Sequence, residues 1–179
     1  MRLNDKVAIV TGAAHGMGEA EARLFAKEGA KVVVADILEA DAEKVAAGIR
    51  ADGGEAIGAK IDVTSEPEWA ALIGRTVATY GRLDILVNNA GISGSSVGDP
   101  DGIDGWNRII AINQTSVFLG NKLAASRWRR PAAARSSISA RSWGLSAARA
   151  ATRPTALRKA RCASTQNRPR CAMARSAFG

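Results

Sequence analysis

The sequence predicts an α/β fold, in which a doubly wound parallel sheet carries helices on both faces. Three observations lead to this prediction. Short apolar runs alternate with helical patterns, glycines close several of the helices, and the alternation holds from residue 6 to about residue 125. Such alternation is typical of parallel strands joined by right-handed helical crossovers. The pattern then stops, so the predicted sheet is C-terminally incomplete.

The first strand and helix open the chain. Residues 7–10 are Val-Ala-Ile-Val, an apolar run typical of a parallel strand that is covered on both faces. Residues 18–28 place alanine, leucine and phenylalanine on one helical face, and Gly29 provides a stop. We expect a short glycine-rich turn between the two.

The next two pairs repeat this order. Residues 31–36 read Lys-Val-Val-Val-Ala-Asp, which predicts a second strand, and a helix is expected at residues 39–50. Residues 55–62 form the third predicted strand. The third helix is predicted at residues 67–80, because Ser65 suits a capping position and a proline stands at the helix start.

The last predicted pair is a strand at residues 83–87, Leu-Asp-Ile-Leu-Val, and a helix from Asp104 to about Ala125. Large apolar residues recur along this segment, which we interpret as one long helix. Core-like patterning ends with it. We therefore divide the chain into an α/β segment, residues 1–125, and a remainder at residues 126–179.

Charge divides the chain at the same point. Residues 1–125 hold all 17 Asp and Glu and 12 of the 25 Lys and Arg, a net charge of −5. Residues 126–179, called here the basic segment, hold 13 Lys and Arg and no acid. The isoelectric point of about 10.2 averages two unlike segments, so it is no evidence for a partner of the whole chain.

Membrane and metal partners are not expected. No apolar run approaches the roughly 18 residues that span a bilayer, and the N-terminus lacks the cleavage pattern of a signal peptide. A cytoplasmic location follows as the expectation. Cys162 and Cys171 have a spacing that matches no common metal or redox motif, so we predict no metal site.

The turn after the first strand reads T-G-A-A-H-G-M-G and begins at Thr11. Gly12 permits a tight turn, Gly16 lets the backbone approach a ligand closely, and Gly18 lets the helix pack on the strand. The helix N-terminus offers N–H groups and a positive dipole end to a pyrophosphate. The turn therefore predicts a Rossmann-like dinucleotide site, with a mere glycine-rich connector as the alternative.

Asp36 ends the second predicted strand, 18 residues after Gly18. A carboxylate there can accept both hydrogen bonds of an adenosine ribose diol and repels a 2′-phosphate, which favours NAD over NADP. Neither neighbour, Ala35 nor Ile37, is an arginine that would attract that phosphate. A solvated aspartate at a strand end is the alternative.

Four further motifs follow in order: A-D-I, I-D-V-T, N-N-A-G and I-I-A-I-N-Q-T-S-V-F-L-G. With the glycine-rich turn, they make residues 6–125 resemble the short-chain dehydrogenases/reductases. The resemblance implies an NAD-dependent oxidoreductase that transfers a hydride between nicotinamide and a small-molecule secondary alcohol or ketone. It also implies a homo-oligomer, although by the same resemblance the chain has lost most of the dimer interface.

The resemblance assigns roles to residues. Asp62 and Val63 would contact adenine, and residues 89–91 would line the ribose region of the cofactor and brace the sheet. Asn113 would be the catalytic asparagine that holds a water in a proton relay; a polar helix residue bonded to neighbouring backbone is the alternative. The complete set of predicted cofactor-binding residues is Gly12, Gly16, Met17, Gly18, Asp36, Ile37, Asp62, Val63, Asn89, Ala90 and Gly91.

The family's remaining catalytic groups are absent. They are a serine, a tyrosine, and a lysine four residues after the tyrosine that lowers its pKa through its positive charge. The sole tyrosine, Tyr80, precedes Gly81 at the end of the third predicted helix, and no Tyr-x-x-x-Lys occurs. We therefore expect this chain to be inactive as written. His15, at a variable position of the turn, is expected to face solvent.

The basic segment has the composition of a GC-rich gene read out of frame. New codons can be built from the last base of each codon and the first two bases of the next. The junctions from Pro131 to Ala134 then admit three glycines, those from Ser137 to Arg141 admit Asn-x-Ser-Ser, and those from Pro154 onward admit Tyr-Ser-Ala-Ser-Lys. These are the missing motifs in order, so we hypothesise a frameshift near codon 126.

Two other functions stay open. The basic segment could serve a nucleotide-binding module as a nucleic-acid-binding arm, with no turnover. Because it offers few aromatic residues and no recognition motif, we expect no specific nucleic-acid partner. A regulatory dinucleotide sensor without turnover is the third hypothesis.

Overall fold

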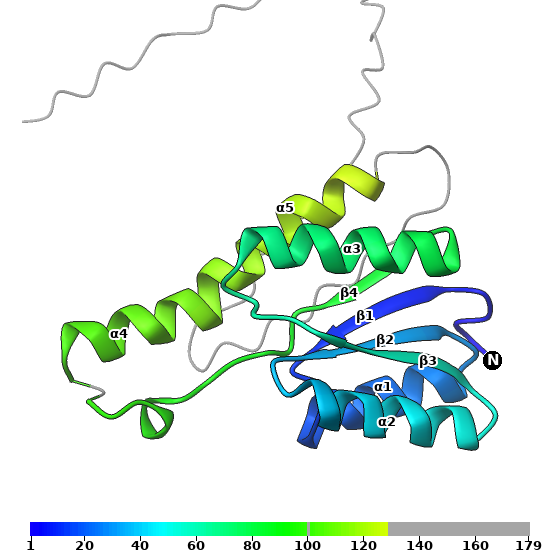
Figure 1. The fold of residues 1–179 in the computed structure, drawn as a ribbon, viewed down its shortest axis with the longest axis horizontal. Helices are drawn as coiled ribbons and strands as arrows, with labels where there is room; N and C mark the ends of the chain where they lie inside the picture. The colour runs from blue at the N-terminus through cyan, green and yellow to red at the C-terminus, as the bar shows by residue number, and fades with distance from the viewer. Residues whose placement is uncertain (100, 129–179) are drawn as a thin grey trace, which may run out of the picture. The chain divides into compact units, whose positions relative to one another are not determined.

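The computed structural model describes residues 1–99 and 101–128 (Figure 1). Strands and helices alternate along this part of the chain, as the sequence predicts. The elements are β1 (Val7–Thr11), α1 (Gly16–Lys27), β2 (Lys31–Asp36), α2 (Glu39–Ala51), β3 (Glu55–Lys60), α3 (Glu66–Tyr80), β4 (Ile85–Val87), the 3-10 turn η1 (Gly94–Ser96), α4 (Ile103–Ile110), the π turn η2 (Ala111–Thr115) and α5 (Ser116–Trp128).

The four strands form one parallel sheet in the order β3-β2-β1-β4. Ile9 of β1 is in register with Val33 of β2 on one side and with Leu86 of β4 on the other. The chain therefore moves outward from β1 to β3 and then returns to the opposite side of β1. This confirms the predicted Rossmann-like, doubly wound α/β sheet.

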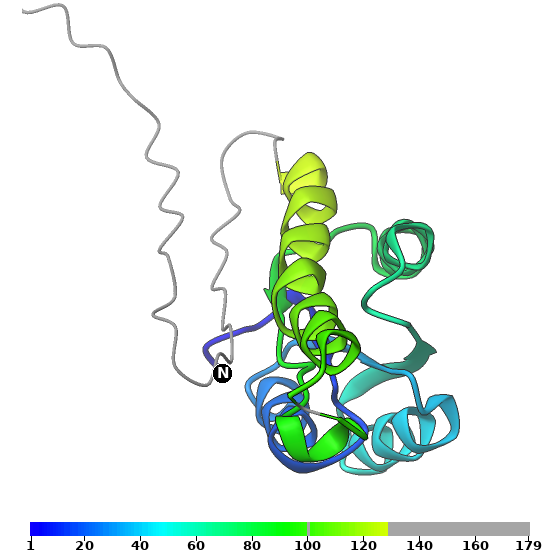
Figure 2. The same cartoon turned by 90° about the vertical axis from the view of Figure 1, so that its left-hand side faces the viewer.

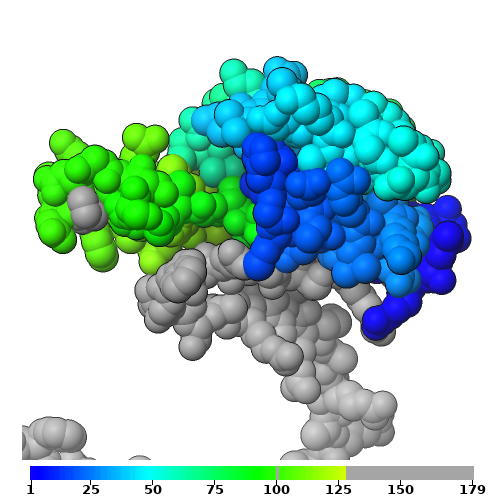
Figure 3. All heavy atoms as spheres, turned by 90° about the horizontal axis from the view of Figure 1, so that it is seen from below, coloured from blue at the N-terminus to red at the C-terminus, as the bar shows by residue number. Residues whose placement is uncertain are grey.

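Helices cover both faces of the sheet (Figure 1). Helices α1 and α2 lie below it, and α3 and α5 lie above it. Two apolar clusters match these layers, because side chains alternate between the two faces along a strand. Val10 and Val32 belong to the cluster that includes residues of α1 and α2, whereas Ile9 and Val33 pack with Trp69 of α3. In the view from below, the atoms of α1 and α2 form the surface of the layer that lies under the sheet (Figure 3).

Local signals fix the ends of the elements. The Ser65 hydroxyl accepts a hydrogen bond from the Glu68 N–H, and Gly81 ends α3 with a φ of 78°. This confirms the predicted capped start of the helix. Directly before β4, the buried Asp84 accepts a hydrogen bond from the Val7 N–H and pairs with Arg82. A carboxylate before β4 thus anchors the start of β1.

The prediction of one long helix from Asp104 to about Ala125 is confirmed. The helical path runs from Ile103 to Trp128 (Figure 2), and the residues Ala111–Thr115 within it form the π turn η2. A π turn inserts an extra residue per turn and is frequent at functional sites. Helix α5 also continues past residue 125, the boundary expected from composition. The rest of the basic segment lies outside the described residues.

Candidate functional site

A cleft of about 400 Å³ opens at the carboxyl ends of the strands. It lies where the order of the sheet reverses, between β1 and β4, which is the usual ligand-binding position of open α/β sheets. Nine of the eleven predicted cofactor-binding residues line it. The lining residues are Gly12, His15, Met17, Asp36, Ile37, Ile61, Asp62, Val63, Asn89, Ala90, Gly91, Ile92 and Ile112.

The turn between β1 and α1 depends on its glycines, and at Gly12 and Gly18 a side chain would also meet neighbouring atoms. Gly12 has a φ of 62°, and a Cβ atom on it would lie 2.8 Å from the Ala90 Cα. A Cβ atom on Gly18 would overlap the Gly12 carbonyl oxygen and lie 2.5 Å from the Asn89 Nδ2. Any larger residue would therefore push the turn away from the end of β4. Gly16 and Gly18 shape the turn without lining the cleft.

The end of β4 is hydrogen-bonded to this turn. The Asn89 Nδ2 donates to the carbonyl oxygens of Thr11 and Gly12, each at 3.0 Å. In return, the Thr11 hydroxyl accepts the N–H groups of Asn89 at 3.1 Å and of Ala90 at 3.2 Å. Sequence analysis gave Thr11 no role, although its place at the end of a strand was a usable signal. These contacts hold one wall of the cleft as a unit.

Asp36 forms part of the cleft wall at the end of β2. Its Oδ2 accepts the Ala14 N–H and its Oδ1 accepts the Leu38 N–H, both at 3.1 Å. An ionised carboxylate has about four acceptor sites, so each oxygen can accept one more hydrogen bond. The two hydrogen bonds from backbone N–H groups hold the Asp36 carboxylate, which can only accept hydrogen bonds, beside the first turn of α1.

Asp62 and Val63 follow β3 and line the cleft next to Ile61. The Asp62 Oδ1 accepts both the Thr64 N–H at 2.9 Å and the Thr64 hydroxyl at 2.7 Å. The Val63 carbonyl accepts the indole N–H of the buried Trp69 at 2.9 Å. The loop is thereby anchored to the upper layer of the fold.

The first turn of α1 carries no side-chain cap. His15 is the N-cap residue and forms no side-chain hydrogen bond with the helix. Instead its Nε2 lies 3.8 Å from the Asp41 Oδ2 at the start of α2. Lys44 donates to Asp41 and lowers the pKa of that carboxyl. His15 is largely exposed yet also lines the cleft, a position that sequence analysis did not assign to it.

Asn113 lies in the π turn η2, behind the cleft wall. Its Oδ1 accepts the Ile92 N–H at 2.9 Å, and its Nδ2 donates to the Ile92 carbonyl at 2.8 Å. The side-chain amide therefore forms hydrogen bonds with both backbone groups of Ile92, in the segment that follows β4. The predicted role of Asn113 in holding a water stays a prediction beside this structural contact. Ile92 and Ile112, which flank this contact, were missed as lining residues.

Comparison with known proteins decides the family. The profile of the short chain dehydrogenases matches residues 6–138, which is more than half of the chain. The chain belongs to the short chain dehydrogenase family. No helix in residues 1–99 and 101–128 of this short chain dehydrogenase has the length and apolar character needed to cross a membrane.

Several dehydrogenases are similar to this short chain dehydrogenase. The 2,5-dichloro-2,5-cyclohexadiene-1,4-diol dehydrogenase of Sphingobium indicum is 46% identical over 123 residues, which cover 69% of this chain and 49% of that protein. The trans-4-hydroxycyclohexanecarboxylate dehydrogenase of Sinomonas cyclohexanicum is 44% identical over 130 residues, 69% of this chain and 50% of the relative. The chain thus spans about half the length of the curated relatives it matches.

A solved structure gives the same assignment. The hydroxysteroid dehydrogenase from Escherichia coli aligns with a TM-score of 0.66 at 39% identity, over 70% of this chain and 53% of that one. The similarity thus extends from sequence motifs to the arrangement of the sheet and its helices. In this short chain dehydrogenase, the cleft lies at the carboxyl edge of that shared sheet.

Proposed function

We propose that this chain is the NAD-binding part of an oxidoreductase that transfers a hydride between nicotinamide and a secondary alcohol or ketone. The observation that carries the proposal is the cleft at the switch point of the sheet, with the fixed Asp36 carboxylate in its wall. An acidic group at this position accepts a ribose diol and repels a 2′-phosphate. NAD is therefore preferred to NADP.

The residues of the cleft suit a dinucleotide. The N-terminus of α1 at Gly16 has no side-chain cap, so its N–H groups and the positive end of its dipole can bind a pyrophosphate. Asp36 would hold the adenosine ribose, and Asp62 and Val63 would contact the adenine. Residues 89–91 would line the other ribose. When bound, NAD would supply the hydride acceptor or donor; this chain's own residues bind and orient it.

The substrate class is supported by the relatives. The similar proteins named above are dehydrogenases of a cyclic diol and of a hydroxylated cyclohexane ring, and a cyclopentanol dehydrogenase of Comamonas is 41% identical over 129 residues. Each of these names describes oxidation of a hydroxyl on a carbocycle. We extend this class, small cyclic secondary alcohols and their ketones, to the complete protein from which this sequence derives.

We further propose that the chain as written binds the cofactor without turning over substrate. Its sequence contains Asn113 but no Tyr-x-x-x-Lys, and the shifted frame near codon 126 admits that motif. Proton transfer to or from the alcohol oxygen needs a positioned acid or base. Resequencing the gene across codons 115–179 tests the frameshift. A confirmed uninterrupted frame, with no match in the shifted one, would overturn it.

Calorimetric titration tests the binding proposal. The full chain is titrated with NAD⁺ and, in parallel, with NADP⁺. We expect saturable binding of NAD⁺ and affinity for NADP⁺ lower by about tenfold or more, the effect of placing a phosphate beside Asp36. A lack of saturation with millimolar NAD⁺, or equal affinity for both dinucleotides, would overturn the proposal.

A further inference from the structure

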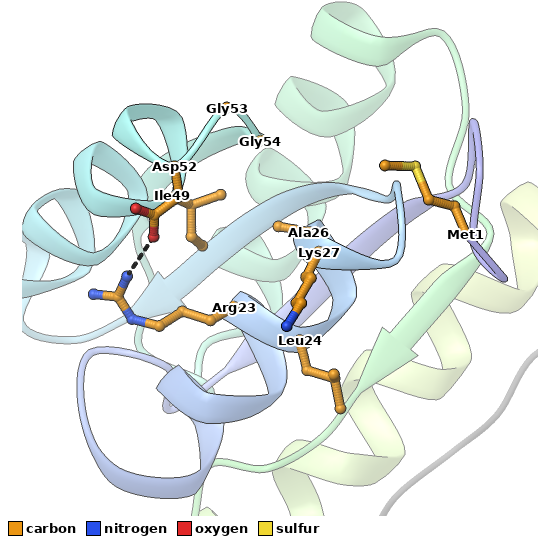
Figure 4. Close-up of a pocket in the computed structure, with 9 residues that line it drawn as sticks. All are labelled: Met1, Arg23, Leu24, Ala26, Lys27, Ile49, Asp52, Gly53 and Gly54. Carbon is orange, nitrogen blue, oxygen red and sulfur yellow. Dashed lines mark ion pairs between the residues drawn. The ribbon is translucent and has the colours of Figure 1, made fainter.

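A second hollow, of about 530 Å³, lies between the C-terminal halves of α1 and α2 (Figure 4). It is at the amino edge of the sheet and shares no lining residue with the cleft at the carboxyl edge. Its size falls within the usual range for small-molecule sites, roughly 300–1,000 Å³. The residues that line it are Met1, Arg23, Leu24, Ala26, Lys27, Ile49, Asp52, Gly53 and Gly54.

The floor of this hollow is apolar. Ala26 and Ile49 belong to the buried core cluster beneath α1 and α2 and also line the hollow. Leu24 adds an apolar wall, and this residue is 55% exposed. An aliphatic body placed here would remove apolar surface from water on both partners, which is favourable by about 25 cal/mol per Å².

Among the charged side chains on the rim of the hollow, Lys27 is the cation without an ion-pair partner in the described residues. Arg23 donates to Glu19 at 2.9 Å and lies 3.8 Å from the Asp52 carboxylate, the contact drawn as a dashed line in Figure 4. Its charge is therefore shared between two acids. No ion pair joins Lys27 to any residue within the described ranges 1–99 and 101–128. An anion on the rim would find Lys27 available.

We propose that the hollow binds a small amphiphilic monocarboxylate, with its aliphatic chain over Ala26, Ile49 and Leu24 and its carboxylate paired with Lys27. The apolar floor favours the aliphatic chain, and the Lys27 ammonium favours a negatively charged head group. An alcohol of the same length would leave Lys27 unpaired. A cationic head group would meet repulsion from Lys27. The inference is independent of the proposed dinucleotide site.

The test uses decanoate, below its micellar concentration, as the probe on the full chain. Calorimetry should show saturable binding of decanoate, with decanol binding at least about fivefold more weakly. Lys27→Glu should weaken decanoate binding about tenfold or more, the size of one lost charge-assisted bond. Lys60→Glu, the same charge change at the end of β3, is the matched control and should stay within twofold of the parent chain.

A second variant addresses the apolar wall. Leu24→Ser alters a largely exposed residue and should leave the far-UV circular dichroism unchanged while weakening decanoate binding severalfold. If Lys27→Glu does not fold, Lys27→Gln replaces it with the same expected direction. The proposal is overturned if decanoate shows no saturation below millimolar concentration, if both variants bind like the parent, or if NAD⁺ displaces decanoate, which would place the probe in the cleft.

Discussion

Asn89 and Thr11 are joined by a reciprocal pair of hydrogen bonds. The Thr11 hydroxyl accepts the backbone N–H of Asn89 at 3.1 Å, and the Asn89 side chain donates to the Thr11 carbonyl at 3.0 Å. Thr11 ends β1, and Asn89 follows the end of the neighbouring strand β4, across the switch point of the sheet. Their contact therefore holds the segment after β4 against the glycine-rich turn. Two parts of the cleft lining are joined in this way.

Asn89→Ala should lower the free energy of unfolding by about 1–3 kcal/mol, because the Thr11 and Gly12 carbonyls lose a partly buried donor. Binding of NAD⁺ should weaken as the turn loosens. Urea denaturation measures the first effect and calorimetry the second. Asn4→Ala, which removes only an exposed contact with Asp5, is the control and should change stability by less than about 0.5 kcal/mol.

Gly18→Ala tests the close packing of α1 on the end of β4. The new methyl group would overlap the Gly12 carbonyl oxygen, so the helix must shift, at a cost of about 1–3 kcal/mol. Gly74→Ala, in α3, is a matched control because its Cβ would meet nothing within 4 Å. That variant should gain up to about 1 kcal/mol from helix propensity. Equal effects of the two substitutions on thermal unfolding would contradict the packing argument.

Asp36→Ala should change cofactor preference. Two hydrogen bonds to the ribose diol are lost, so NAD⁺ affinity should fall about tenfold or more, whereas NADP⁺ no longer faces a negative charge and should bind as well or better. Titration of both dinucleotides measures the ratio. Asp101→Ala, an exposed change outside the cleft lining, should leave the ratio unaltered. An equal loss of affinity for both dinucleotides would indicate that the substitution damages the glycine-rich turn instead.

Glu43 links stability to pH. Its hydrogen bonds with Arg50 at 2.7 Å and with the Gly58 N–H at 3.0 Å lower the pKa of its carboxyl below 4.5. A lowered pKa means that the stabilisation is complete above the unfolded-state value and is lost as the pH falls through the folded-state value. Unfolding free energy should therefore drop between about pH 5 and pH 3. Glu43→Gln should show a shallower drop in acid denaturation; an identical slope would contradict the assignment.

The sequence predicted most of the fold and the cleft because their signals are local. The sequence shows directly that an apolar run ends in Asp36 and that Asn89 follows another such run. Because the strands pair in parallel, both residues then lie at the same edge of the sheet. The π turn at Ala111–Thr115 was not predicted, and neither was the hydrogen bond that Asn113 within it forms with Ile92, because a contact between residues 21 positions apart is not encoded in a local pattern. His15 was judged by its variable position, and only the geometry shows it both exposed and in the cleft wall.

Shifting the reading frame near codon 126, where we propose that a frameshift lies, should create activity. We expect the present chain, with NAD⁺ and cyclopentanol, to produce no NADH above background, because nothing in its sequence supplies the Tyr-x-x-x-Lys proton donor and acceptor. The frame-corrected protein should oxidise the alcohol to the ketone, reduce NAD⁺ to NADH and release one proton, at about 1–10³ per second for a good substrate. Absorbance at the NADH band measures both.

The cofactor site provides the internal control for this comparison. Because the cleft is built from residues that precede codon 126, both proteins should bind NAD⁺, and Asp36→Ala should weaken binding in both. Turnover by the present chain, with its C-terminal sequence verified by intact mass, would contradict the assignment of the missing proton-transfer groups. Binding by neither protein would instead count against the dinucleotide site itself, so the two failures are distinguishable.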